Sequence, residues 1–257
     1  MTKLCIKLFD IPDWVIKIGF NDISYDDRND YCDVCNYYMG EPDPSDYYSS
    51  ITSDLTGTSL LSALQSLNSS KRKRTISYAG MKTFAPICDA NPDNKDLPNY
   101  WDNQATWNRE HVWPKSLGGD KVEGDAFMPR PCDVDINGGR GNKVYSKTAY
   151  DPGSEGYANY RGICARIIFY CVVACPSLRI VDSDSGDGSS MGKLSDLLEW
   201  NLAYLPSKSE TAALELKVEQ NRNNVIEPHK NGQGNRNPFI DHPEYACKIW
   251  GKTNSTS

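Results

Sequence analysis

The residues with the clearest chemical potential lie in two polar segments in the middle of the chain. Residues 107–119 read WNREHVWPKSLGG, and residues 125–142 read DAFMPRPCDVDINGGRGN. Glu110 and Asn142 offer a carboxylate and a carboxamide oxygen, hard ligands that suit Mg²⁺ when several waters complete its shell. The imidazole of His111, if neutral and close to such a cation, can take a proton from a water that attacks phosphorus. These three residues predict metal-assisted hydrolysis of a phosphate ester.

The elements that carry these side chains must bring them together. The aromatic and β-branched residues around His111 predict a strand that ends before Pro114. Neighbouring residues on a strand point to opposite faces, so Glu110 and His111 can serve one site only where the strand twists or ends. The polar, glycine-rich residues 133–142 follow Pro131 and provide the second part of the site.

The two segments resemble the bacterial endonuclease I family, whose members carry the ββα-metal (His-Me finger) nuclease core. WNREHVWPKS is similar to the family segment that activates the nucleophile. A third similar block, GNRNPFIDHPE, lies at residues 234–244. Three ordered blocks within residues 47–250 are more specific than any single short motif. The second segment matches the family pattern at Arg130, Pro131, Asp133, Asn137, Arg140 and Asn142.

The resemblance implies a single α+β domain in which a ββα-metal core, near residues 105–145, is surrounded by helices. It implies that His111 is the general base and that Arg130 contacts the scissile phosphate or the product. It also implies that Glu110 and Asn142 bind Mg²⁺, or another divalent cation such as Mn²⁺ or Ca²⁺. The implied activity is hydrolysis of DNA, and often of RNA, with little sequence preference, leaving 5′-phosphate and 3′-hydroxyl ends.

Two features depart from the family pattern. Residues 125–128 read Asp-Ala-Phe-Met, where many members have Asp-Leu-His-His before the Arg-Pro pair. Any role of those imidazoles is therefore in doubt, although Glu110, His111 and Asn142 are present. The second feature is the set of glycines within residues 138–141, each of which disfavours a helix by about 1 kcal/mol. Packing, or metal binding through Asn142, has to hold that helix.

The composition limits how the chain can handle nucleic acid. The 257 residues carry 28 Lys and Arg against 34 Asp and Glu, for a net charge of −6. Proteins that coat nucleic acid spend many cations on phosphates, so the acidic balance excludes that class and leaves local phosphate binding. We expect Arg130, Arg140 and the basic cluster at residues 71–74 to supply local positive charge. Such a cluster is also typical of a solvated helix end.

Nine cysteines indicate an oxidising compartment with disulfides, and we expect a secreted protein. Cys32 and Cys35 form a CxxC pair, which is a disulfide, half of a zinc site, or two unpaired thiols. The first 20 residues lack the apolar run and cleavage site of a signal peptide, so the signal is absent or the chain is a mature or mis-started form. The cysteines of the apolar run 163–175 are either core side chains or disulfide partners.

The remaining pattern is mostly helix and loop. Leucines from 60 to 67 predict an amphipathic helix that ends near Asn68, and residues 163–175 predict a buried core helix. A capping box at Ser207 predicts a further helix that ends at Pro228. No apolar stretch is long enough to cross a bilayer. We expect an N-terminal extension at residues 1–46, a nuclease domain at 47–250 and a flexible tail at 251–257, in a monomer that binds nucleic acid and not membranes.

Other interpretations stay open beside these. Arg130 could instead pair with Asp125 or Asp133, and His242 is expected to be structural. Residues 235–237, Asn-Arg-Asn, either contact a DNA backbone or cap the turn before Pro238. At the level of function, the alternatives are a catalytically inactive, secreted binding or scaffold protein that retains the fold, and a zinc module built on the CxxC pair. The residues do not decide between DNA and RNA.

Overall fold

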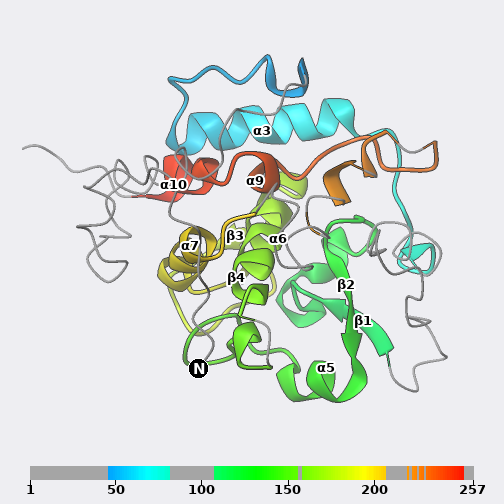
Figure 1. The fold of residues 1–257 in the computed structure, drawn as a ribbon, viewed down its shortest axis with the longest axis vertical. Coiled ribbons are helices and arrows are strands. Elements are labelled where there is room, and N and C mark those ends of the chain that lie inside the picture. Colours follow the sequence, from blue (N-terminus) through cyan, green and yellow to red (C-terminus); the bar gives the residue numbers. More distant parts are fainter. Residues whose placement is uncertain are drawn as a thin grey trace, which may run out of the picture.

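The computed structural model describes residues 46–81, 107–155, 158–206, 219, 222–224, 226–228 and 230–251. A small antiparallel hairpin lies at one side of a group of helices, so the fold is mixed helix and small sheets, compatible with the predicted α+β class (Figure 1). In chain order, the elements are η1 (Asp46–Tyr48), α3 (Gly57–Lys71), β1 (Trp107–His111), η2 (Lys115–Leu117), η3 (Gly119–Val122), β2 (Pro129–Asp133), α5 (Val134–Arg140), η4 (Pro152–Glu155), α6 (Tyr160–Ala174), β3 (Arg179–Ile180), β4 (Ser190–Met191), α7 (Leu194–Ala203), α9 (Pro238–Asp241) and α10 (Glu244–Trp250).

Helix α6 lies at the centre of the fold and contacts α3, α7 and α9 (Figure 1). It confirms the predicted core helix, because apolar residues cover nearly its whole surface and most of them are buried. Arg166 is fully buried within it, and its Nε and Nη2 donate to the two carboxylate oxygens of Glu219 at 2.6 and 2.7 Å. Its Nη1 donates to Asn201 Oδ1 at 3.1 Å. A buried charge needs such partners, so the arginine acts as a structural cross-link.

Helix α3 confirms the predicted amphipathic helix and extends it by three residues beyond Asn68. Leu60, Leu64 and Leu67 are buried on the face that packs against α6 and α10. The Arg72 N–H donates to the Asn68 carbonyl at 2.9 Å and closes the last turn. The basic cluster follows directly, so its backbone leaves the helix towards the hairpin (Figure 1).

Strands β1 and β2 form the antiparallel hairpin, and α5 follows β2 without a break. The predicted strand around His111 is therefore confirmed. The Asp133 carboxylate caps α5 by accepting from the N–H groups of Asp135 at 2.9 Å and Ile136 at 3.2 Å. Gly141 ends the helix with φ 57°, in the left-handed region that glycine adopts at little cost. Capping and packing thus hold a helix whose glycines disfavour it.

The residues before α9 are buried and structural. The Asn237 side chain accepts from Phe239 N–H at 3.0 Å and caps α9, as one of the two open interpretations predicted. Arg236 forms a bidentate ion pair with Asp241, with both distances 2.7 Å. His242 lies against two tyrosine rings and contacts Glu244 through Nδ1 at 2.9 Å, in line with the expected structural role. Residues 235–237 are at most 7% exposed, which leaves them no surface for a DNA backbone.

Several predictions fall wholly or mostly outside the described residues: residues 1–45 of the extension predicted at 1–46, the CxxC pair, most of the helix from Ser207, and residues 252–257 of the tail predicted at 251–257. Residues 222–224 of that helix are helical. No disulfide joins one described cysteine to another, so the disulfide expectation finds no support there. Cys171 is fully buried in α6, as the core interpretation predicted. Among the described residues, no helix is long and apolar enough to span a membrane.

Candidate active site

The two faces of the hairpin separate the predicted site residues. Glu110 pairs with Arg130 in the register, and His111 pairs with Pro129. Directly opposed residues of an antiparallel pair share a face, so Glu110 and Arg130 lie on one face and His111 points to the other. Asn108 Oδ1 accepts from Asn137 Nδ2 at 2.6 Å, which places α5 on the Glu110 face. His111 is the last residue of β1, where the strand ends as the sequence required.

Glu110 is buried and anchored by a cation from α5. Its Oε1 accepts from Arg140 Nη1 at 2.6 Å and from the Tyr145 hydroxyl at 3.2 Å. Burial raises the pKa of Glu110, and the nearby Arg140 and Tyr145 lower it in part. Arg140 also donates to the carbonyls of His111 at 2.9 Å and Val112 at 3.0 Å. One guanidinium therefore fixes both the carboxylate and the backbone at the end of β1.

This role corrects the expectation that Arg140 adds to an exposed positive patch. Its residue surface is only 2% exposed, and its guanidinium lies 4.5 Å from the centroid of the Tyr145 ring. A buried cation beside a buried carboxylate balances the charge of that carboxylate and is not available to phosphates from solvent. The sequence motif contained the arginine but did not indicate the partner, which lies 30 residues earlier.

His111 is half-buried among Tyr78, Glu123 and Lys115. Its ring lies 4.6 Å from the Tyr78 ring, centroid to centroid, and its Nε2 lies 3.5 Å from Glu123 Oε2. Glu123 Oε2 in turn pairs with Lys115 Nζ at 2.6 Å. Burial and the charge of Lys115 lower the pKa of His111, against an opposing effect of Glu123. The lowered pKa favours the neutral imidazole, which is the form that can accept a proton.

Tyr78 is itself clamped onto β1 by Arg109. The Arg109 guanidinium lies 3.7 Å from the centroid of the Tyr78 ring, and its Nη1 donates to the Tyr78 carbonyl at 2.5 Å. The Tyr78 hydroxyl donates to the Arg109 carbonyl at 3.2 Å. The segment after the basic cluster is thus held beside His111, a contact that nothing in the sequence pattern predicted.

Of the other two predicted site residues, Arg130 lies on β2 and Asn142 follows α5. Asn142 is exposed, two residues beyond the end of α5. Arg130 is half-buried and faces the same side as Glu110. Its charge also acts on Cys164 of α6, where burial raises the thiol pKa to about 12 and Arg130 partly offsets that rise.

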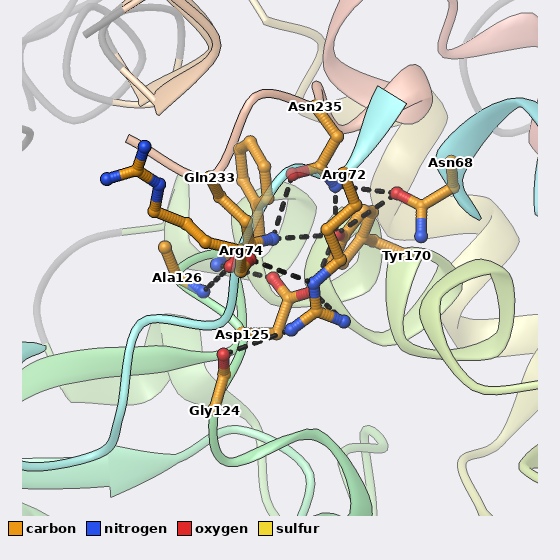
Figure 2. A network of polar contacts seen from close by, with 10 residues as sticks. Asn68, Arg72, Arg74, Gly124, Asp125, Ala126, Tyr170, Gln233 and Asn235 are labelled. Atoms are coloured by element: carbon orange, nitrogen blue, oxygen red, sulfur yellow. Dashed lines mark hydrogen bonds and ion pairs between the residues drawn. The ribbon is translucent and has the colours of Figure 1, made fainter. Parts of the chain in front are cut away.

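Residues 125–128, where many family members have two histidines, are part of the core of this chain. Phe127 and Met128 are buried, and the Phe127 ring lies 4.8 Å from the Tyr170 ring. Asp125 is fully buried and accepts from the Tyr170 hydroxyl at 2.8 Å, while Arg72 lies 3.4 Å from it (Figure 2). This segment therefore has a structural role in this chain.

Lys115 and Glu123 are the site residues that the sequence analysis missed. Both flank the two short 3-10 helices, which meet at Gly118 and Gly119. Gly118 has φ 97°, and a Cβ on Gly119 would lie 1.8 Å from the Trp113 carbonyl oxygen. Only glycines allow this tight double turn, so the Gly-Gly pair was the available signal that the chain folds back towards His111.

Metal ligands of the usual types are sparse in the described part of the chain. It contains no group of three or more His, Cys, Asp or Glu side chains that could hold a metal ion. A cation bound here would therefore rely on few protein ligands, together with amide oxygens, waters or substrate phosphates. That coordination is typical of Mg²⁺ and unlike a closed structural zinc site.

Comparisons with known proteins identify the family of this chain. The chain matches the sequence profile of Endonuclease I over residues 47–158. It is 34% identical over 247 residues to the extracellular ribonuclease of Bacillus amyloliquefaciens, covering 81% of this chain and 79% of that protein. It is 38% identical over 171 residues to the extracellular ribonuclease of Bacillus subtilis (strain 168), covering 58% and 55%, respectively. No solved structure matches it. The chain belongs to the endonuclease I family, and it is a nuclease.

Proposed function

We propose that this protein is a secreted, divalent-metal-dependent nuclease that cleaves RNA as well as DNA with little sequence preference, leaving 5′-phosphate and 3′-hydroxyl ends. The observation that carries the proposal is a half-buried imidazole at the end of β1, directly after a buried carboxylate, and burial lowers the pKa of that imidazole. RNA is included because two relatives are named extracellular ribonucleases, and secretion is proposed from the same names.

His111 is the proposed general base. A neutral imidazole accepts a proton from the attacking water and later releases it, and a positioned base of this kind typically accelerates hydrolysis about 10²- to 10⁴-fold. Tyr78 holds the ring from one side, so little motion is needed to present the imidazole to a bound substrate. Restricting the ring keeps the base in the orientation that the reaction needs.

Glu110 and Asn142 are the proposed ligands of the cation. Both hydrogen bonds that the Glu110 carboxylate accepts from the described residues fall on Oε1, which leaves Oε2 for a metal. Asn142 offers an exposed amide oxygen after α5. One carboxylate and one amide oxygen suit a hard ion that keeps several waters. When bound, such an ion would stabilise negative charge on the phosphate and on the leaving oxygen.

Arg130 is the proposed phosphate contact. It shares the hairpin face with Glu110, and it is exposed enough to reach solvent. The guanidinium can bind two phosphate oxygens at once, which holds the substrate in a fixed orientation.

Cleavage is expected to require a divalent cation. Labelled single-stranded RNA and supercoiled plasmid should be cut with Mg²⁺, should survive in EDTA, and should be cut again after excess Mg²⁺ is restored, with 5′-phosphate ends on the products. Asn142→Ala should raise the Mg²⁺ concentration for half-maximal rate, whereas Asn159→Ala, at the start of α6, should leave it unchanged. Equal cutting in EDTA, or cyclic 2′,3′-phosphate ends, would contradict the mechanism. No cutting of either polymer would favour the inactive scaffold.

The basic cluster divides into an inward and an outward part. Arg72 turns inward, where its Nη2 donates to the Gly124 carbonyl at 3.1 Å and its Nη1 lies 3.4 Å from Asp125 (Figure 2). Lys73 and Arg74 are exposed, and only three residues separate Arg74 from Tyr78. We therefore propose that Lys73 and Arg74 contact substrate phosphates that flank the cleavage site.

Removing these two charges should weaken substrate binding without changing the chemical step. For Lys73→Gln/Arg74→Gln, we expect KM for long RNA to rise about 3- to 10-fold and the slope of log(kcat/KM) against log[salt] to become shallower by about 1 to 2. The value of kcat should stay within about twofold, because neither residue reaches His111. Lys248→Gln is the control, since α10 lies at the far end of the fold (Figure 1). An unchanged salt slope would exclude phosphate contacts at these positions.

A further inference from the structure

The chain contains two Asn-Gly pairs, and the fold places them in different surroundings. Asn231 is exposed in a turn before α9, and Gly232 follows it at a bend of the chain. Asn137 and Gly138 lie inside α5, where Asn137 Nδ2 donates to Asn108 Oδ1 at 2.6 Å. The helix therefore restrains one pair, whereas the other lies in irregular backbone with its asparagine at the surface.

An Asn-Gly pair can lose ammonia without an enzyme when its backbone is free to bend. The glycine nitrogen attacks the carbonyl carbon of the asparagine side chain and gives up its proton, ammonia leaves, and a cyclic imide forms. Water then opens the imide at either carbonyl, which leaves an aspartate or an isoaspartate in place of the asparagine. Glycine favours the attack because it has no side chain to block the approach, and asparagine is a thermolabile residue. An α-helix opposes the attack, because the N–H that must react is hydrogen-bonded to the preceding turn.

The exposed pair lies next to the basic cluster that follows α3. The Lys73 N–H donates to the Gln233 carbonyl at 2.8 Å. A Cβ on Gly234 would lie 2.9 Å from the Lys71 carbonyl oxygen and 2.9 Å from Lys73 Cγ, so the two segments are in close contact. Two residues of chain span at most about 7 Å, which places Asn231 close to Lys73. A new carboxylate at this position would therefore lie near exposed cations.

We propose that Asn231 is a site of spontaneous deamidation in the folded protein, and that the carboxylate formed there weakens substrate binding. Each conversion adds a negative charge to the surface beside Lys73 and Arg74. A unit charge about 7 Å from a cation changes binding about 2- to 3-fold in water, and salt screens the effect. Affinity for nucleic acid therefore falls as the protein ages. The effect on binding rests on the phosphate contacts proposed for Lys73 and Arg74, whereas the deamidation itself does not.

Mass spectrometry of peptides from aged protein tests the modification. The full-length protein is incubated in mildly alkaline buffer, which favours loss of the glycine amide proton, and a portion unfolded in guanidinium chloride serves as the reference. We expect Asn231 to convert to isoaspartate and aspartate in the folded protein, while Asn137 converts only in the unfolded portion. Asn231→Gln should stay unmodified at this position, because the longer side chain closes its ring far more slowly. An Asn231 that stays intact in the folded protein would overturn the proposal, as would equal conversion of the two pairs.

Asn231→Asp reproduces the added charge in a homogeneous protein. At low salt, we expect KM for long RNA to rise about 2- to 3-fold with kcat unchanged, and the difference to disappear at high salt. Asn231→Gln is the matched control, because it keeps a neutral amide and should have the KM of the natural protein. An unchanged KM in Asn231→Asp at low salt would overturn the effect on binding. If the protein cleaves no nucleic acid while Asn231 still deamidates, the proposed function fails and the modification site stands.

Discussion

His111→Ala is expected to lower kcat for RNA and DNA cleavage about 10²- to 10⁴-fold, which is the usual contribution of a positioned general base. Because His111 is half-buried and packs mainly against Tyr78, its truncation should cost little stability. Initial rates on a fluorescent oligonucleotide measure the loss, and a thermal melt checks the fold. Because the lost group is an imidazole that acts as a base, imidazole added to the buffer should restore part of the rate.

The matched control for this experiment is His242→Ala. His242 is also half-buried and also contacts a carboxylate, that of Glu244, but it packs among tyrosines in the C-terminal part of the fold. Its loss should lower the midpoint of unfolding while leaving kcat nearly unchanged for the protein that remains folded. Equal activity losses in the two variants would show that stability, and not proton transfer, explains the effect. Undiminished cutting by His111→Ala would remove the base assignment altogether.

Arg140→Met should give the largest loss of stability among the site variants. It leaves the buried Glu110 carboxylate without its cation and the carbonyls of His111 and Val112 without a donor. Removing one partner of a buried ion pair typically costs about 3–5 kcal/mol, and urea denaturation with an unchanged m-value would measure it. Activity should fall as well, because Arg140 fixes the end of β1.

A double-mutant cycle separates the lost ion pair from the lost packing. Glu110→Gln in the Arg140→Met background removes the stranded charge, so part of the stability should return as a coupling energy of about 0.5–3 kcal/mol. Arg179→Met, which breaks the exposed pair with Asp187, should cost no more than about 1 kcal/mol. If Arg140→Met lowered the free energy of unfolding by no more than about 1 kcal/mol, Glu110 would be neutral or solvated, contrary to the buried pair.

Local patterns predicted the elements, because their signals are local. The leucine spacing of α3, the apolar run of α6 and the strand that ends at His111 all depend on residues within one element. The caps followed the same logic, since Asn237 lies directly before α9. Helix ends moved by about three residues because the last turn depends on the fold around it.

Partners across the fold were not predictable in the same way. The motifs contained Glu110 and Arg140, but nothing in the sequence indicated that the two side chains would form a buried ion pair. Glu123 had no motif at all, and only the tight turn at Gly118 and Gly119 brings it to His111. Side-chain direction on β1 also explains why Glu110 and His111, adjacent in sequence, have separate surroundings.

The buried network of Figure 2 joins the loop that contains Glu123 and Asp125 to a segment that comes much later in the chain. Ala126 N–H donates to Gln233 at 2.9 Å, and Asn235 donates to Tyr170 and Asn68, both at 2.6 Å. The Ala126 N–H of this loop therefore lacks its partner until a segment about 100 residues later docks. Because the chain is synthesised from its N-terminus, the hairpin is made long before the segment that completes the buried network. Residues 233 to 235 must therefore dock before the buried network beside the hairpin is complete.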